Sequence, residues 1–356
     1  MSVKNATEKV GQPAGGTGPF YGWYVVAAVF TVMTVTAGLG FYNLSVYLKA
    51  FVAQGGFSVS ATSGATACFF IASGITGLGV ASLIERYDPR WVITAGATMC
   101  AIATLGAGHV SELWQLYLFY VLFGMGYSAS ALIPGTTLVA RWFARRRSVA
   151  LSIASTGLSL GGIIITPFAA SLIERTGLQG ATPWLAIGFI VGIVPVAWLL
   201  IRPSPQAMGT GPDGDPILRD DSGQPLPADG IEYRSAISSR FFILSCSAFI
   251  FAMMAQVGVI AHQFSLVAGR SGSDDTAALA VAIMAFASIA GRLAGGWALT
   301  FIPSRGFVIA LVITQGVALI FYAMADTTTG LIVATVLFGI TIGNLLMMQP
   351  LMLAEA

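Results

Sequence analysis

The run Ala277–Thr300, AALAVAIMAFASIAGRLAGGWALT, decides the fold that we predict for this chain. A helix needs about 20 apolar residues to cross a bilayer, and this run has that length with one charge, Arg292, in its half nearer the predicted inner side. A guanidinium held in lipid costs several kcal/mol, and such residues usually face a polar cavity or a partner. The neighbouring Gly291, Gly295 and Gly296 leave room for the long side chain. We therefore predict that Arg292 anchors an anion inside a membrane protein.

Composition places the whole chain in the membrane class. Of its 356 residues, 56% are hydrophobic and 9% are charged, and the mean hydropathy is +0.82, which lies outside the range of soluble globular domains. No basic stripe indicates nucleic acid. Cys68, Cys100 and Cys246 each fall inside an apolar run, where a thiol behaves as a small hydrophobe. We expect no disulfide framework, no metal site and no cofactor.

The apolar runs predict transmembrane helices rather than barrel strands, because they are continuous instead of alternating at every second residue. Residues 1–19 are polar and predict a disordered cytoplasmic tail. Ten spans follow, at residues 23–50, 61–84, 91–109, 113–139, 148–173, 183–201, 241–267, 277–300, 306–324 and 330–353. The predicted fold class is therefore an all-α polytopic membrane bundle.

The basic residues predict the orientation of these spans. With the N-terminus inside, the outer segments hold only Lys49, Arg175 and Arg270. The inner segments hold thirteen of the 17 basic residues: Lys4, Lys9, Arg86, Arg90, Arg141, Arg145, Arg146, Arg147, Arg202, Arg219, Arg234, Arg240 and Arg305. Because inner loops carry the excess of Lys and Arg, we predict a cytoplasmic N-terminus in the inner (cytoplasmic) membrane.

The region 202–240 differs from the rest in composition. It is rich in Pro, Gly and Asp and has no apolar run, which indicates a cytoplasmic linker between two bundles. The predicted organisation is a six-helix bundle at 20–201, this linker, and a bundle at 241–356 with four helices.

Several motifs, in this order along the chain, resemble those of the major facilitator superfamily. The turn ERYDPR at 85–90 is similar to its acidic-basic loop signature, although Glu85 stands where the family usually has Asp. GWY at 22–24 and RWFARRRSVA at 141–150 resemble its monocarboxylate transporter and oxalate/formate antiporter branch. GVIAHQ at 258–263 and GRLAGG at 291–296 are similar to the seventh and eighth helices of bacterial members.

The resemblance implies two pseudo-symmetric six-helix halves that carry a solute across the membrane. The chain departs from the family pattern at three places. Thr300 stands where a loop Asp is usual, and Ser288 stands where animal members have an Asp. They also have a lysine in the first helix, where this chain has the uncharged Tyr42-Asn43. The chain ends after ten predicted spans, so we expect an incomplete second half.

The chemistry of the chain argues against an enzyme. No P-loop lysine motif, HExxH or Ser-His-Asp order is present. The energy for transport must then come from a gradient of the solute or of a coupled ion. The planar guanidinium of Arg292 matches a carboxylate in bidentate geometry. The alternative for Arg292 is a structural role, either at the inner interface or bonded to a helix C-terminus.

Four further residues are candidates for substrate binding. Tyr42 and Asn43 lie along the outer half of the first span, where the alternative is an interfacial aromatic belt. Tyr127 lies well inside the fourth span, where its phenol either contacts the solute or packs against neighbours. Asn344, beside Gly343, either contacts the solute or bonds a neighbouring helix.

His262 is a candidate proton acceptor near the outer end of the seventh span, with a hydrogen bond to a neighbouring helix or headgroup as the alternative. An inner gate is the hypothesis for a set of charged cytoplasmic residues, the alternative being a topology signal on a solvated face. These residues are Glu85, Arg86, Arg90, Arg145, Arg146 and Arg147.

The function that we predict is secondary active transport of a small organic anion, a mono- or dicarboxylate, by alternating access. Proton symport and exchange both remain open. The alternatives are a facilitator for a neutral or zwitterionic solute and a truncated, inactive transporter-like protein. The expected partners are the solute, protons in the case of symport, and the lipid bilayer. A monomer is compatible with this arrangement.

Overall fold

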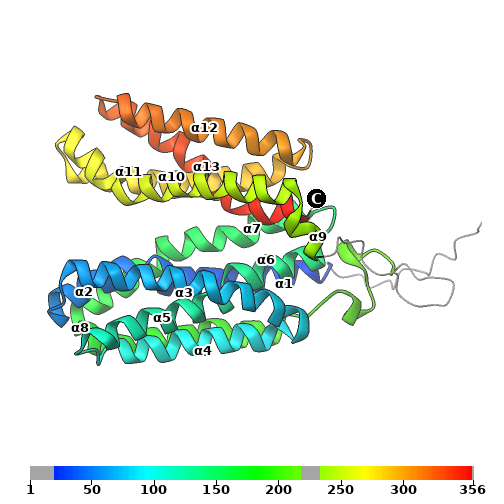
Figure 1. Ribbon diagram of the computed structural model, residues 1–356, viewed down its shortest axis with the longest axis horizontal. Coiled ribbons are helices and arrows are strands. Elements are labelled where there is room, and N and C mark those ends of the chain that lie inside the picture. The colour runs from blue at the N-terminus through cyan, green and yellow to red at the C-terminus, as the bar shows by residue number, and fades with distance from the viewer. Residues whose placement is uncertain (1–19, 218–232, 355–356) are drawn as a thin grey trace, which may run out of the picture.

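The computed structural model describes residues 20–217 and 233–354 of the chain. Within these ranges all regular structure is helical and no strand is present. The long helices lie side by side, with their axes along the longest dimension of the molecule (Figure 1). The predicted all-α bundle is confirmed, whereas the predicted tail at 1–19 lies outside the described residues.

Nine helical stretches of the described residues are long and apolar enough to cross a membrane. Helices suit this environment because they pair their backbone polar groups internally, where lipid offers no partner. The first part of the chain forms α1 (Gly22–Thr36), the π-helical turn η1 (Ala37–Phe41), α2 (Leu44–Gly55), α3 (Val59–Arg86), α4 (Pro89–Ala107), α5 (Leu113–Ser130), α6 (Leu132–Trp142), α7 (Arg147–Leu160), the π-helical turn η2 (Gly161–Ile165) and α8 (Thr166–Leu200).

The predicted fifth and sixth spans form one helical stretch, 147–200. The chain turns within it at Gly177 (φ 71°, ψ 170°), a left-handed conformation that glycine adopts without steric cost. After this turn α8 runs back beside α4, where Trp198 Nε1 donates to Thr94 Oγ1 at 3.0 Å. The stretch 147–200 therefore accounts for two of the ten predicted spans, and nine stretches of the described residues correspond to ten spans. The connection predicted at 174–182 is helical on both sides of Gly177.

The helices α1 to α8 are called the first group, and the second part of the chain forms the second group. It consists of α9 (Tyr233–Ser238), α10 (Arg240–Ser271), α11 (Asp274–Ala298), α12 (Ser304–Met324) and α13 (Thr328–Ala354). Between the two parts, the region predicted as a linker contains the short 3-10 turns η3 (Gln206–Met208) and η4 (Pro212–Gly214). Figure 1 shows α7 between the two groups, and α7 contacts both α11 and α13. The helix that joins the groups is thus α7.

The two π-helical turns face each other where the first span crosses the fifth. A Cβ atom on Gly38 would lie 2.7 Å from the carbonyl oxygen of Gly161, and a Cβ on Gly161 would lie 2.7 Å from the nitrogen of Gly38. Thr166 Oγ1 also donates to the Gly38 carbonyl at 3.0 Å. Only glycine permits this approach, and it sets the path of Tyr42, which directly follows η1.

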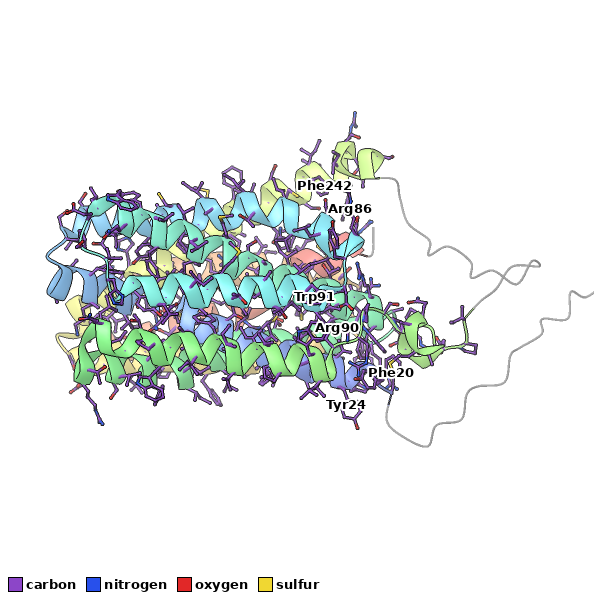
Figure 2. All side chains as sticks on the ribbon, turned by 90° about the horizontal axis from the view of Figure 1, so that it is seen from below. Phe20, Tyr24, Arg86, Arg90, Trp91 and Phe242 are labelled. Carbon is purple, nitrogen blue, oxygen red and sulfur yellow. The ribbon has the colours of Figure 1, made fainter. Side chains whose placement is uncertain are left out.

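One end of the molecule carries the charged turn between α3 and α4. Figure 2 shows Phe20, Arg86, Arg90 and Trp91 at this end, which we call the Arg90 end. It is the end that the basic residues predict to be cytoplasmic.

Asp88 begins α4 at the Arg90 end and is held by Arg90. Its Oδ1 accepts the backbone N–H of Arg90 at 2.9 Å, and the guanidinium donates to both carboxylate oxygens at 2.6–3.0 Å. Burial raises the pKa of Asp88, but the hydrogen bonds and charge of Arg90 lower it further, so that the net pKa lies below its ordinary value. The carboxylate is therefore favoured in the folded protein.

A carboxyl group with a lowered folded pKa contributes stability above its unfolded pKa of about 3.9, and this contribution is lost as the pH falls through the folded pKa. We expect Asp88→Ala to cost about 1 kcal/mol at pH 7, as loss of a helix cap does, and the difference from wild type to shrink below about pH 4. Melting temperatures in detergent at pH 7 and in acid measure this. Asp88→Asn retains the cap and is the control; equal melting temperatures of Asp88→Ala and wild type at pH 7 would contradict the prediction.

Candidate functional site

Arg292 is the only Lys, Arg, Asp or Glu among the buried residues that the structure describes, at 1% exposure. Its guanidinium extends from α11 to α7, where one terminal nitrogen donates to the backbone oxygen of Ser155. On the other side it lies against α13, where a Cβ on Gly343 would be 2.6 Å from Nε and 3.0 Å from a terminal nitrogen. Arg292 therefore bridges the two groups of helices and does not extend to the membrane interface.

The guanidinium is only partly satisfied. Its Nε is buried and has no hydrogen-bond partner among the described residues. A buried charged group without its full set of hydrogen bonds is costly. The arrangement thus leaves donor capacity for a further acceptor.

A row of serines on α7 forms the other side of this contact. Ser152 Oγ donates to the backbone oxygen of Arg292 at 2.5 Å, so that each helix donates to the other. Ser148, Ser152, Ser155 and Ser159 are all buried. We did not identify them from the sequence, although their spacing of three or four residues places them on one helical face and was a usable signal.

Tyr42 lies close to Arg292. Its ring packs against η2, because a Cβ on Gly162 would lie 2.9–3.0 Å from ring atoms of Tyr42. Its phenol lies beside Ser159 and within electrostatic range of the guanidinium. The side chain is 38% exposed. The structure thus brings the predicted substrate residue Tyr42 close to Arg292.

Tyr127 lies on the Tyr42 side of the first group. Its ring centroid is 5.3 Å from that of Phe69 and 6.4 Å from that of Phe41, and its phenol is within electrostatic range of Tyr42. Aromatic packing, one of the two predicted roles, accounts for these contacts.

Asn43 occupies a different environment from Tyr42. It is fully buried beside Tyr47, whose ring packs on Phe119 and Phe123 inside the first group. Neither amide atom of Asn43 has a hydrogen-bond partner among the described residues. Adjacent helical residues lie about 100° apart, so the structure separates the two residues that the sequence analysis grouped.

Asn344 ties α13 to α11 beside Arg292. Its Nδ2 donates to the backbone oxygens of Gly291 at 2.8 Å and Ile340 at 2.9 Å, while its Oδ1 is buried without a partner. Its side chain also lies against Gly295. These contacts match the alternative of a bond between helices.

His262 is exposed on α10. Among the described residues, no hydrogen bond joins it to the Arg292 site. Its role as a proton acceptor stays a prediction.

In this conformation Arg90, Arg145, Arg146 and Arg147, four of the predicted gating residues, bond to the first group of helices or to the segment that follows α8. Arg90 pairs with Asp88, and Glu85 and Arg86 are exposed. Arg147 donates to the backbone oxygens of Phe143 and Ala140 at 3.0 and 3.2 Å. Arg145 and the backbone N–H of Arg146 bond to the segment that follows α8.

The match to known proteins is broad. Residues 30–356 match the family model described as Major Facilitator Superfamily. The chain is 27% identical over 352 residues to Monocarboxylate transporter 13 of Bos taurus, covering 94% of this chain and 74% of that protein. It is 24% identical over 280 residues to the MFS-type transporter hasB of Aspergillus fumigatus, covering 77% of this chain and 61% of that protein.

Solved structures agree on the fold. The proton:xylose symporter XylE bound to 6-bromo-6-deoxy-D-glucose superposes with a TM-score of 0.66 at 11% identity, over 94% of this chain and 82% of that chain. The transporter FucP in the outward conformation gives a TM-score of 0.60 at 16% identity, over 93% and 86%. With the family model spanning nearly all of the helical region, the chain belongs to the Major Facilitator Superfamily and is a multi-pass membrane transporter.

Proposed function

We propose that this transporter carries a small organic anion, a mono- or dicarboxylate, by alternating access. The observation that carries the proposal is Arg292, a buried cation at the contact between the two groups of helices with an unpartnered Nε. A guanidinium is the side chain best suited to pair with a carboxylate in a site of low polarity. The similarity to a relative named as a monocarboxylate transporter supports the same class.

In this mechanism the solute carboxylate accepts hydrogen bonds from Arg292, and Tyr42 offers its phenol from the other half. An anion at this place competes with the backbone oxygen of Ser155 for the guanidinium. Binding then loosens the contact between α7 and α11, which permits the halves to move. We take residues 20–201 and 241–356 as the two moving bodies, with the N-terminus in the cytoplasm and the protein in the inner membrane.

A facilitator for a neutral or zwitterionic solute is the second candidate. The bond from Arg292 to Ser155 and the bond from Ser152 to Arg292 favour it, because together they suffice to make Arg292 a structural tie. In that case substitution of Arg292 lowers stability and leaves solute selectivity unchanged.

Uptake into proteoliposomes separates the two candidates. We expect the reconstituted chain to take up one or more of labelled lactate, formate and oxalate, and to exclude a neutral sugar. Stimulation by an inward proton gradient indicates symport, and stimulation by solute preloaded inside indicates exchange. Saturable uptake of the sugar with no carboxylate uptake would overturn the anion assignment in favour of the facilitator.

A further inference from the structure

The turn that leads into α7 is held by a carboxylate that lies far along the chain. Asp213 Oδ2 accepts the backbone N–H of Ala144 at 2.8 Å and of Arg145 at 2.6 Å, and Oδ1 accepts that of Arg146 at 3.4 Å. Arg146 directly precedes α7, so its N–H has no partner within the helix, whereas Ala144 and Arg145 belong to the turn before it. A negative charge at a helix N-terminus is favourable. The residue before α7, Arg146, supplies no side-chain cap of its own. Asp213 instead holds the turn that leads into α7 and places its charge at the start of that helix.

The turn around Asp213 presents its carboxylate to α7. Asp213 has a left-handed backbone (φ 57°), as does Gly214 (φ 84°), and the N–H of Gly211 closes the turn on the Asp215 oxygen at 2.6 Å. Asp is one of the few non-glycine residues that adopt this conformation readily. Arg145 also pairs with Asp215 at 2.8 Å, but this pair is exposed and contributes little.

The segment that carries Asp213 is docked on the first group of helices at the Arg90 end. Trp142 Nε1 donates to the Arg202 oxygen at 3.2 Å. The Phe20 ring, visible at this end in Figure 2, contacts the rings of Trp142 and Phe143 and lies against Gly214. Residues 202–215 therefore pack against the first group, within the region that the sequence analysis assigned to the linker.

The helix that follows this turn is the one that holds Arg292. From Arg146 to Ser155 is nine residues of helix, about 13 Å at 1.5 Å per residue. Because α7 is continuous over this length, a displacement of its first turn moves Ser152 and Ser155 against α11. The two bonds between these serines and Arg292 depend on the register of the two helices.

We propose that Asp213 is a positioning residue for transport: by holding the turn before α7 it keeps Ser155 in register with Arg292 and makes α7 move with the first group of helices. The inference rests on the proposed role of Arg292 for its effect on transport. The claim that Asp213 keeps Ser155 in register with Arg292 is independent of the solute.

Hydrogen exchange of the purified full chain tests this contact. We expect Asp213→Ala to raise exchange of the amides at 144–146 by about tenfold or more, which corresponds to lost bonds worth roughly 1.4 kcal/mol or more. Asp215→Asn removes only the exposed pair with Arg145 and is the matched control, with exchange within about twofold of wild type. Unchanged exchange in Asp213→Ala would overturn the proposal.

A double-mutant cycle tests the positioning without any solute. Distant, independent sites give additive effects, so coupling between Asp213 and Arg292 is informative. We expect the Asp213→Ala substitution to lower the melting temperature at least twice as much when it is made in wild type as when it is made in the Arg292→Gln variant. Additive shifts would show that Asp213 holds the turn before α7 without positioning Ser155, and would overturn the proposal whichever solute is carried.

Transport kinetics complete the test. They are measured with whichever solute the uptake experiment identifies, so that a failure of the carboxylate assignment is distinguished from a failure of the role of Asp213. We expect Asp213→Ala to lower Vmax threefold or more, with KM within twofold because Arg292 itself remains on α11. Asp213→Asn is expected to restore more than half of Vmax, since its Oδ1 still accepts two N–H groups and Asn tolerates the left-handed backbone. A Vmax for Asp213→Ala equal to wild type would contradict the proposal.

Discussion

Replacing Arg292 by Gln is expected to lower kcat/KM for carboxylate uptake by about 100-fold or more. The estimate follows from the roughly 3–5 kcal/mol that is lost when one partner of a buried ion pair is removed and the other charge is left unpaired. Arg292 is 1% exposed, so water does not replace it. The measurement is the initial rate of labelled carboxylate uptake into proteoliposomes over a range of concentrations.

Two variants control for this result. Arg292→Lys keeps the charge but loses the planar fork, and we expect it to retain uptake at reduced affinity. Arg270→Gln removes a cation that binds the backbone oxygens of Tyr322, Ala323 and Ala325 at the end of α12, and we expect lower stability with unchanged selectivity. If Arg292→Ala transports carboxylates as wild type does, the anion site is wrong.

Gly343→Ala is expected to produce the second-largest loss, because the new methyl group occupies the space of the guanidinium. A Cβ there would lie 2.6 Å from Arg292 Nε and 2.7 Å from the Ser288 backbone oxygen. The guanidinium can shift, but the Ser288 oxygen belongs to the helix backbone and cannot do so without moving α11. Overpacking of this kind costs about 1–3 kcal/mol, and the shift displaces Arg292 from its place beside α7. We expect carboxylate uptake to fall at least tenfold and the melting temperature to fall with it.

Gly316→Ala is the matched control on α12. No atom lies within 4 Å of a Cβ built at Gly316, and alanine is favoured over glycine in a helix by up to about 1 kcal/mol. We expect uptake equal to wild type and an equal or higher melting temperature. The packing argument fails if Gly343→Ala and Gly316→Ala behave alike.

The helices were predictable because lipid imposes a simple rule on composition. Continuous apolar runs located the spans, and the distribution of basic residues predicted which ends of the spans are cytoplasmic. The turn at Gly177 was not predictable in detail, since its left-handed backbone permits a helix-to-helix turn where the polar residues of 174–182 indicated a loop. The π-helical turns were also missed, because they depend on the contact between Gly38 and Gly161 from two different spans.

The candidate site was predictable only in part. A lone arginine in an apolar run identified Arg292, because charge in a membrane is rare and costly. Its observed partner is a backbone oxygen, that of Ser155, and every residue has one, so side-chain identity carried no signal. Asn43 was wrongly grouped with Tyr42 for the opposite reason, because its polar side chain suggested a site residue. Although it is next to Tyr42 in sequence, it lies in the interior of the first group.

The contact between Asp213 and the turn before α7 shows why distance along the chain matters. Asp213 lies in a segment whose composition indicates a linker, and its acceptor contacts are backbone groups 67 to 69 residues away. No local pattern encodes such a contact. It required the structure, which places that segment against Trp142 and Phe20.

Equilibrium binding of an acid and of its neutral amide to the purified chain tests the anion site most directly. The two ligands have nearly the same shape, and the charge-assisted hydrogen bond to Arg292 distinguishes them by about 1.5–3 kcal/mol. By calorimetry at pH 7, we expect the transported acid to bind wild type at least about tenfold more tightly than its amide, and Arg292→Gln to lose this preference. Equal binding of acid and amide to wild type, or an undiminished preference in Arg292→Gln, would contradict the account.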